Sequence, residues 1–91
     1  MRIEKIEVYS DVPNMAVLRH PGREFPGLLL QGDTLNALCV QIADVLAGGP
    51  DALDDLEDLQ SRLLGMLSHY ISVLEEHDLK LPFPMPAVSD N

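Results

Sequence analysis

The feature that most constrains this chain is a series of leucines whose spacing predicts one long helix. Between residues 51 and 76, apolar side chains recur every three or four positions without an intervening proline: Leu53, Leu56, Leu59, Leu63, Leu67, Tyr70 and Leu74. A helix of about 26 residues would be ~39 Å long. Strands of five or six residues span only ~17–20 Å, so this helix should extend beyond any sheet that the chain can form.

That difference in length leaves two alternatives for the helix. It breaks at Gly65, because glycine inside a helix costs ~1 kcal/mol relative to alanine. If it continues unbroken, the leucines that lie beyond the sheet need a partner, and a second copy of the chain is the simplest one.

A first, shorter helix is predicted from Gly32-Asp33-Thr34 to the Gly48-Gly49-Pro50 terminator. Its apolar positions form one helical stripe: Leu35, Leu38, Cys39, Ile42, Val45 and Leu46. No other element lies so close in sequence as the preceding strands, so we expect this stripe to be buried against a sheet. Cys39 would then be a buried structural thiol.

The amino-terminal third reads as three strands separated by turns, at residues 3–9, 15–19 and 25–31. The run Leu28-Leu29-Leu30 suggests burial on both faces, and so a central strand. The predicted fold class is α+β, in the order β-β-β-α-α, with an antiparallel sheet covered on one face by both helices.

The carboxy-terminal segment has proline at every second position between Pro82 and Pro86, so it should be extended. Leu81, Phe83 and Met85 either fold back onto the domain or form a docking strip. We expect one α+β domain at residues 1–86 and a frayed tail at residues 87–91.

The chain is acidic, with 15 Asp and Glu against 6 Lys and Arg and a formal net charge of −9. Such a charge repels nucleic-acid phosphates and anionic membrane surfaces, so neither is expected as a direct partner. Two interpretations of the charge remain open: it provides solubility alone, or it complements a basic protein partner.

The single cysteine excludes an intrachain disulfide and thus a disulfide-stapled secreted fold. The first nine residues lack the apolar stretch of a signal peptide, and no apolar run is long enough to span a bilayer. These features favour a cytoplasmic protein.

The sequence offers no catalytic, cofactor-binding or metal-binding constellation, so we do not expect an enzyme. His69 and His77 would stand ~12 Å apart along the helix, too far to share one metal ion. Acidic residues instead cluster on the long helix without basic neighbours. The candidate partner-binding residues are Asp54, Asp55, Glu57, Asp58, Glu75 and Glu76.

Two resemblances accompany these patterns. The stretch Phe25-Pro26-Gly27-Leu28-Leu29-Leu30-Gln31-Gly32-Asp33-Thr34-Leu35-Asn36-Ala37-Leu38 is similar to HicB-like antitoxins, with local similarity over residues 25–46. The resemblance implies a small antiparallel sheet carrying a helix. It also implies neutralisation of a small, basic, RNA-cleaving toxin.

Over its full length the chain resembles an uncharacterised bacterial family of small proteins. The parts that carry this resemblance are Val8-Tyr9-Ser10, residues 25–35, His69-Tyr70, Val73-Leu74, His77 and Leu81-Pro82-Phe83. It implies no activity, but it suggests that His69, Tyr70 and His77 share a role in packing the helix against the tail.

The leading functional hypothesis is therefore a non-enzymatic, acidic binding module of antitoxin or immunity type that masks a basic partner. The alternative is a homodimeric structural or regulatory protein, assembled through residues 53–74 of the long helix.

Overall fold

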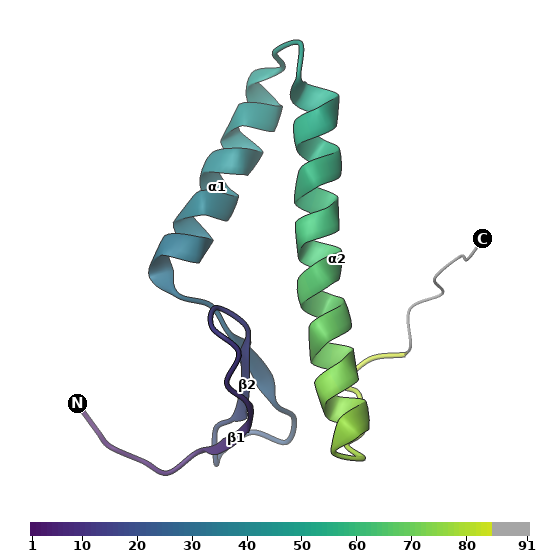
Figure 1. The fold of residues 1–91 in the computed structure, drawn as a ribbon. Coiled ribbons are helices and arrows are strands. Elements are labelled where there is room, and N and C mark those ends of the chain that lie inside the picture. Colours follow the sequence, from purple (N-terminus) through teal and green to yellow (C-terminus); the bar gives the residue numbers. More distant parts are fainter. Residues whose placement is uncertain (85–91) are drawn as a thin grey trace.

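A computed structural model describes residues 1–84 of the chain (Figure 1). It contains three strands followed by two helices, which confirms the predicted order β-β-β-α-α. The elements are β1 (Glu7–Ser10), β2 (Ala16–Arg19), β3 (Gly27–Leu29), α1 (Gly32–Ala47) and α2 (Ala52–Glu76).

The three strands form one antiparallel sheet in the order β1-β2-β3. Val8 pairs with Leu18 across the first ladder, and Val17 pairs with Leu28 across the second. The expectation of a central strand around Leu28-Leu29-Leu30 is wrong, because β3 is an edge strand and Leu29 is exposed. The buried strand is β2, whose Val17 is completely inaccessible to solvent.

The core lies where the carboxy-terminal part of α2 crosses the sheet. Val17, Tyr70, Val73 and Leu74 form its buried cluster. Partly buried apolar side chains surround it: Tyr9, Leu28, Leu79, Leu81 and Phe83. This small cluster is the main source of hydrophobic stability for the sheet.

The segment after α2 folds back onto this core. The Phe83 ring stacks on Tyr70 with 6.3 Å between ring centroids, and Leu81 packs beside it. Fold-back is thus confirmed for Leu81 and Phe83, whereas Met85 and the predicted frayed tail lie outside the described residues.

The two helices form an antiparallel hairpin, and α1 packs mainly against α2 rather than on the sheet (Figure 1). The expectation that α1 buries its stripe against the sheet is therefore wrong. The turn between the helices begins at Gly48, whose φ of 75° lies in the left-handed region that glycine adopts without strain. α1 and the sheet consequently lie one after the other along the same side of α2 (Figure 1).

The long helix is unbroken from Ala52 to Glu76, and Gly65 sits within it without a kink in the hydrogen-bonded pattern. Of the two alternatives for the helix, the structure has the continuous one. No helix among residues 1–84 combines the length and the hydrophobicity needed to cross a membrane.

Candidate functional site

The helical hairpin leaves most of its apolar side chains uncovered. Between residues 32 and 67, only Leu38 of α1 and Leu59 of α2 are buried, where the two helices pack against each other. Seven leucine and isoleucine side chains of the hairpin are between 45% and 80% exposed: Leu35, Ile42, Leu46, Leu53, Leu56, Leu63 and Leu64. Cys39 is exposed as well, so its predicted burial is wrong.

These exposed side chains gather on one broad side of the hairpin. With 100° of rotation per residue, Leu35, Ile42 and Leu46 lie about a quarter turn from the α2-facing side of α1. The exposed leucines of α2 lie about a quarter turn from Leu59, which faces α1. Viewed along each helix from its amino terminus, this rotation has the same direction as that in α1. Because the helices are antiparallel, the two stripes point the same way. We call this surface the apolar face: Leu35, Cys39, Ile42, Leu46, Leu53, Leu56, Gln60, Leu63 and Leu64.

The opposite broad side of the hairpin carries carboxylates. Its acidic side chains, all exposed, are Asp33 and Asp44 of α1 together with Asp54, Asp58 and Glu76 of α2. We call this surface the acidic face. Residues 32–67 contain seven carboxylates and one arginine, a net charge of −6, whereas residues 1–31 contain four acidic and four basic residues and are neutral.

The structure distributes the six predicted partner-binding residues over both ends of α2. Glu57 and Glu75 lie 18 residues apart, which is five helical turns, so they project in the same direction ~27 Å from each other. Asp58 and Glu76 repeat this relation. Asp55 differs, because it is half-buried and turned toward α1, where Gln41 Nε2 donates a hydrogen bond of 3.3 Å to its backbone carbonyl.

None of these six carboxylates forms an ion pair with any residue from 1 to 84. Five of the six basic residues of the chain lie outside the hairpin, and Arg62 is its single basic residue. The carboxylates of α2 are therefore free to meet cations from outside the chain.

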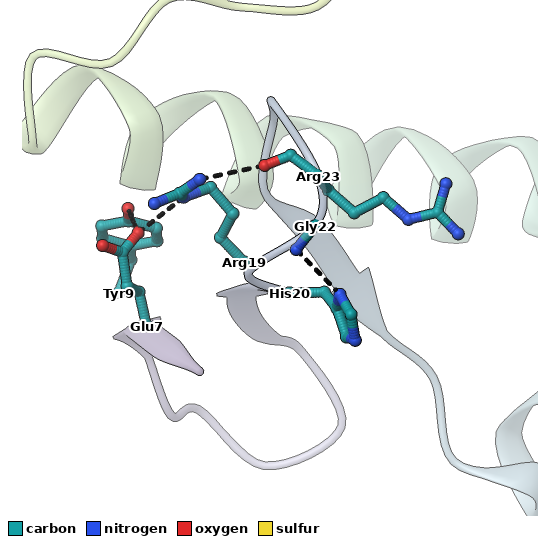
Figure 2. Close-up of polar contacts among 6 residues, drawn as sticks. All are labelled: Glu7, Tyr9, Arg19, His20, Gly22 and Arg23. Atoms are coloured by element: carbon teal, nitrogen blue, oxygen red, sulfur yellow. Dashed lines mark hydrogen bonds and ion pairs between the residues drawn. The ribbon is translucent and has the colours of Figure 1, made fainter. Parts of the chain in front are cut away.

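A second polar cluster, on the sheet, was not anticipated from the sequence (Figure 2). Arg19 Nε donates a hydrogen bond of 2.6 Å to Glu7 Oε1, and Tyr9 Oη donates to the same oxygen at 2.5 Å. Arg19 Nη1 also donates to the carbonyl of Arg23 at 2.9 Å. The Arg19 hydrogen bond, followed by that of Tyr9, lowers the pKa of Glu7 from 4.5 to about 2.

This cluster borders a hollow of 340 Å³ that is open to solvent, between the sheet and the segment after α2. Phe25, Pro26 and Lys80 contribute to its walls. Glu7 and Arg19 already satisfy each other across the β1–β2 ladder, so their pairing has a sufficient structural explanation. The signal in the sequence was two opposite charges on neighbouring strands, which becomes informative only once the strand register is known.

His69 of α2 and His77, directly after it, make contacts within the fold. His69 Nε2 donates to the Met15 carbonyl at 2.9 Å, and His77 Nδ1 donates to the Val73 carbonyl at 3.0 Å. The His77 ring meets Tyr9 edge-on at 5.1 Å. Residues 1–84 contain no group of three potential ligands that could hold a metal ion.

Tyr70 is the polar anchor of α2 in the buried core cluster. Its hydroxyl donates a hydrogen bond of 2.6 Å to the Pro26 carbonyl, and burial raises the pKa of its phenol. The expected packing against the tail is found for Tyr70 alone, which meets Phe83. His69 and His77 instead contact Met15 and Tyr9 of the sheet region, so the shared role predicted for the three residues is wrong for these two.

Comparisons with known proteins give one match. No curated protein and no solved structure matches the chain. Residues 1–83, which span the sheet, both helices and most of the segment after them, match the family described as Family of unknown function (DUF6959). The sheet, the hairpin and the Tyr70 anchor all fall within that match, and the chain belongs to the DUF6959 family.

Proposed function

We propose that this chain is a non-enzymatic binding module that masks a basic protein partner, in the manner of antitoxins and immunity proteins. One observation carries the proposal. Exposed carboxylates line α2 at both ends, and no basic side chain of residues 1–84 neutralises those of the candidate set. An electrostatic field of one sign recruits a partner of the opposite sign and speeds its association.

The segregation of charge supports this use of the helix. If the charge provided solubility alone, acidic residues could be spread over the whole surface. Here the segment 1–31 is neutral, and the hairpin segment 32–67 has a net charge of −6. The attraction is therefore directional, and a basic partner would meet the hairpin rather than the sheet.

The spacing of the carboxylates indicates the size of the partner surface. Glu57 and Glu75 project in one direction ~27 Å apart, which matches the width of a small domain. A single exposed ion pair contributes little, but several acting together on one partner give specificity and a fast association rate. We place this activity in the cytoplasm of a bacterium, where Cys39 would remain reduced.

The test is affinity capture from cells that naturally contain the protein, followed by binding measurements on the purified partner at low and high salt. We expect a basic partner whose affinity falls steeply with salt. A chain with Asp54→Asn, Glu57→Gln, Asp58→Asn, Glu75→Gln and Glu76→Gln should bind at least about tenfold more weakly, because each removed charge weakens a fully solvated but concerted attraction.

The matched control replaces two exposed carboxylates outside the hairpin, Asp11→Asn and Glu24→Gln. It should leave the affinity unchanged. A partner without net positive charge, or binding that is insensitive to salt and to the five amide substitutions, would refute the electrostatic proposal.

A further inference from the structure

We infer that the apolar face of the hairpin binds the same face of a second copy of this chain, so that two hairpins form a four-helix arrangement. This inference goes beyond the proposed function, because it concerns the apolar face, whereas Asp54, Asp58 and Glu76 of the candidate set lie on the acidic face opposite it. It extends the interface from the leucines of α2 to those of α1.

The area of the apolar face is the first argument. Its seven exposed aliphatic side chains add up to about four fully exposed leucines, or about 700 Å². The largest apolar patch on a typical monomer is about 300–600 Å². A stable interface buries about 800 Å² on each partner, so this face alone supplies most of the area that a dimer needs.

The shape of the molecule is the second argument. The two helices of the hairpin lie side by side and form a single layer, because α1 packs mainly against α2 (Figure 1). Domains are normally built from at least two packed layers. The sheet covers only the other end of α2, as Figure 1 shows, so the second layer over the hairpin has to come from another molecule.

The spacing along α2 is the third argument, and it points to a second copy. Leu53, Leu56, Gln60, Leu63 and Leu67 follow one another at intervals of three, four, three and four residues, as in coiled-coil seams. Gln60 stands at the centre of this series. A two-fold axis at Gln60 would place leucines opposite leucines and the two amides opposite each other, where they can exchange hydrogen bonds.

The distribution of charge favours a second copy of the chain over a membrane or a basic protein as the occupant of the apolar face. The five carboxylates of the acidic face lie on the opposite side of the hairpin. Glu57 stands at the edge of the seam, where it lines a hollow of 380 Å³ together with Leu53, Leu56 and Gln60. Two apolar faces can therefore meet with the acidic faces on the outside and Glu57 at the solvated rim. An anionic membrane surface would be repelled by residues 32–67, whose net charge is −6, and a basic protein would be drawn to the acidic face instead.

Sedimentation equilibrium of the full chain is the test. The wild type should have twice the monomer mass of 10.0 kDa at micromolar concentration. Leu63→Glu should weaken self-association by at least about 30-fold, because a two-fold interface contains the substituted side chain twice. The matched control is Val40→Glu, which adds the same charge at a similarly exposed position of the hairpin on the other face and should leave the dimer intact.

The reaction of Cys39 with a thiol reagent gives a second readout in the same samples. Cys39 lies on the apolar face, so its reaction should be slower in the wild type and in Val40→Glu than in Leu63→Glu. Circular dichroism checks that the Leu63→Glu chain keeps its helices.

Two outcomes would overturn the inference: a wild type that stays monomeric up to high micromolar concentration, or a Leu63→Glu chain that still dimerises. If the wild type is monomeric and Leu63→Glu abolishes capture of another protein, the face belongs to that protein. The five amide substitutions on α2 should leave the dimer mass unchanged, so a failure of the proposed function and a failure of this inference are distinguishable.

Discussion

The two halves of α2 continue the same three-four spacing of apolar residues but have opposite surroundings. In the carboxy-terminal half, Leu74 is completely buried and Tyr70 is 7% exposed, both against the sheet and the returning tail. In the amino-terminal half, Leu53 is 68% exposed and Leu56 is 48% exposed. The helix is continuous through both halves, so its own conformation does not cause the difference.

The comparison shows what a helical repeat can and cannot predict. A three-four spacing identifies the side of a helix that is apolar. It does not identify what covers that side, because coverage depends on the length of the helix relative to its neighbours. In this chain strands of three and four residues cover only one end of a helix of 25 residues.

The largest difference in stability between the two halves should appear when one leucine is truncated in each half. Leu74→Ala should lower the free energy of unfolding by about 3 kcal/mol, because it removes buried methyl groups and leaves a cavity in a small core. Leu64→Ala, at a position that is 52% exposed, should cost less than about 1 kcal/mol in the monomer. Urea denaturation at a concentration where the protein is monomeric measures both, and equal losses would contradict the comparison.

Removing the hydroxyl of Tyr70 tests a single hydrogen bond in the packed carboxy-terminal half of α2. Tyr70→Phe removes the 2.6 Å hydrogen bond to the Pro26 carbonyl and leaves that carbonyl without its partner. We expect a loss of about 1–2 kcal/mol in the free energy of unfolding, while the ring stays in place against Phe83. The control is Tyr9→Phe, whose hydroxyl bonds to the exposed Glu7, and it should cost less.

A substitution in the middle of α2 should raise the stability of the protein rather than lower it. Gly65→Ala places a methyl group where no atom lies within 4 Å, so nothing opposes it sterically. Alanine favours the helix by about 0.5–1 kcal/mol over glycine, so this variant should be more stable than the wild type. A decrease in thermal stability would show that Gly65 is needed for a close approach by another molecule.

The smallest effect should come from the cross-strand pair on the sheet. The pKa of Glu7 is lowered in the folded state, so its contribution to stability is fully present above pH 4.5 and is lost as the pH falls toward about 2. Glu7→Gln should therefore be slightly less stable than the wild type at pH 7, and the two should converge in acid. Both side chains are solvated, so added salt should also reduce the difference. A constant difference between pH 7 and pH 2 would contradict this reading.

Most of the secondary structure could be predicted from the sequence. The order of the five elements and the limits of both helices follow from apolar spacing, turn residues and the Gly48-Gly49-Pro50 terminator. The first strand is shorter than expected, Glu7–Ser10 in place of 3–9, and Ile6 and Val8 are exposed. Their alternation with charged residues resembled a half-buried strand, but the core reaches this strand only at Tyr9.

The packing of the elements against one another was predicted less well than the elements themselves, for a physical reason. Leu35, Ile42 and Leu46 were expected to face the sheet, and Leu28-Leu29-Leu30 was expected at its centre. Periodicity identifies the apolar side of a helix or strand, but it does not identify what that side packs against. The direction in which α1 leaves the sheet is set by the short link at Leu30 and Gln31. α1 instead pairs with α2, which an antiparallel helical hairpin with a short turn makes favourable.

The candidate surfaces also differ in how well the sequence predicts them. The carboxylates of α2 and the uncovered leucines were visible in the sequence, because charge runs and helix length are local properties. The apolar face was not, since it requires that Leu35, Ile42 and Leu46 of α1 lie on the same side of the hairpin as the leucines of α2. The Glu7–Arg19 pair likewise needed the register of β1 and β2.

The most direct test of the contrast within α2 follows its leucine methyl groups individually, by NMR of a methyl-labelled chain diluted from high to low micromolar concentration. The signals of Leu53, Leu56 and Leu63 should shift or broaden on dilution as the second copy dissociates, while that of Leu74 should stay constant. Invariant signals from Leu53, Leu56 and Leu63, or a Leu74 signal that moves together with them, would contradict the claim that the two halves are covered by different molecules.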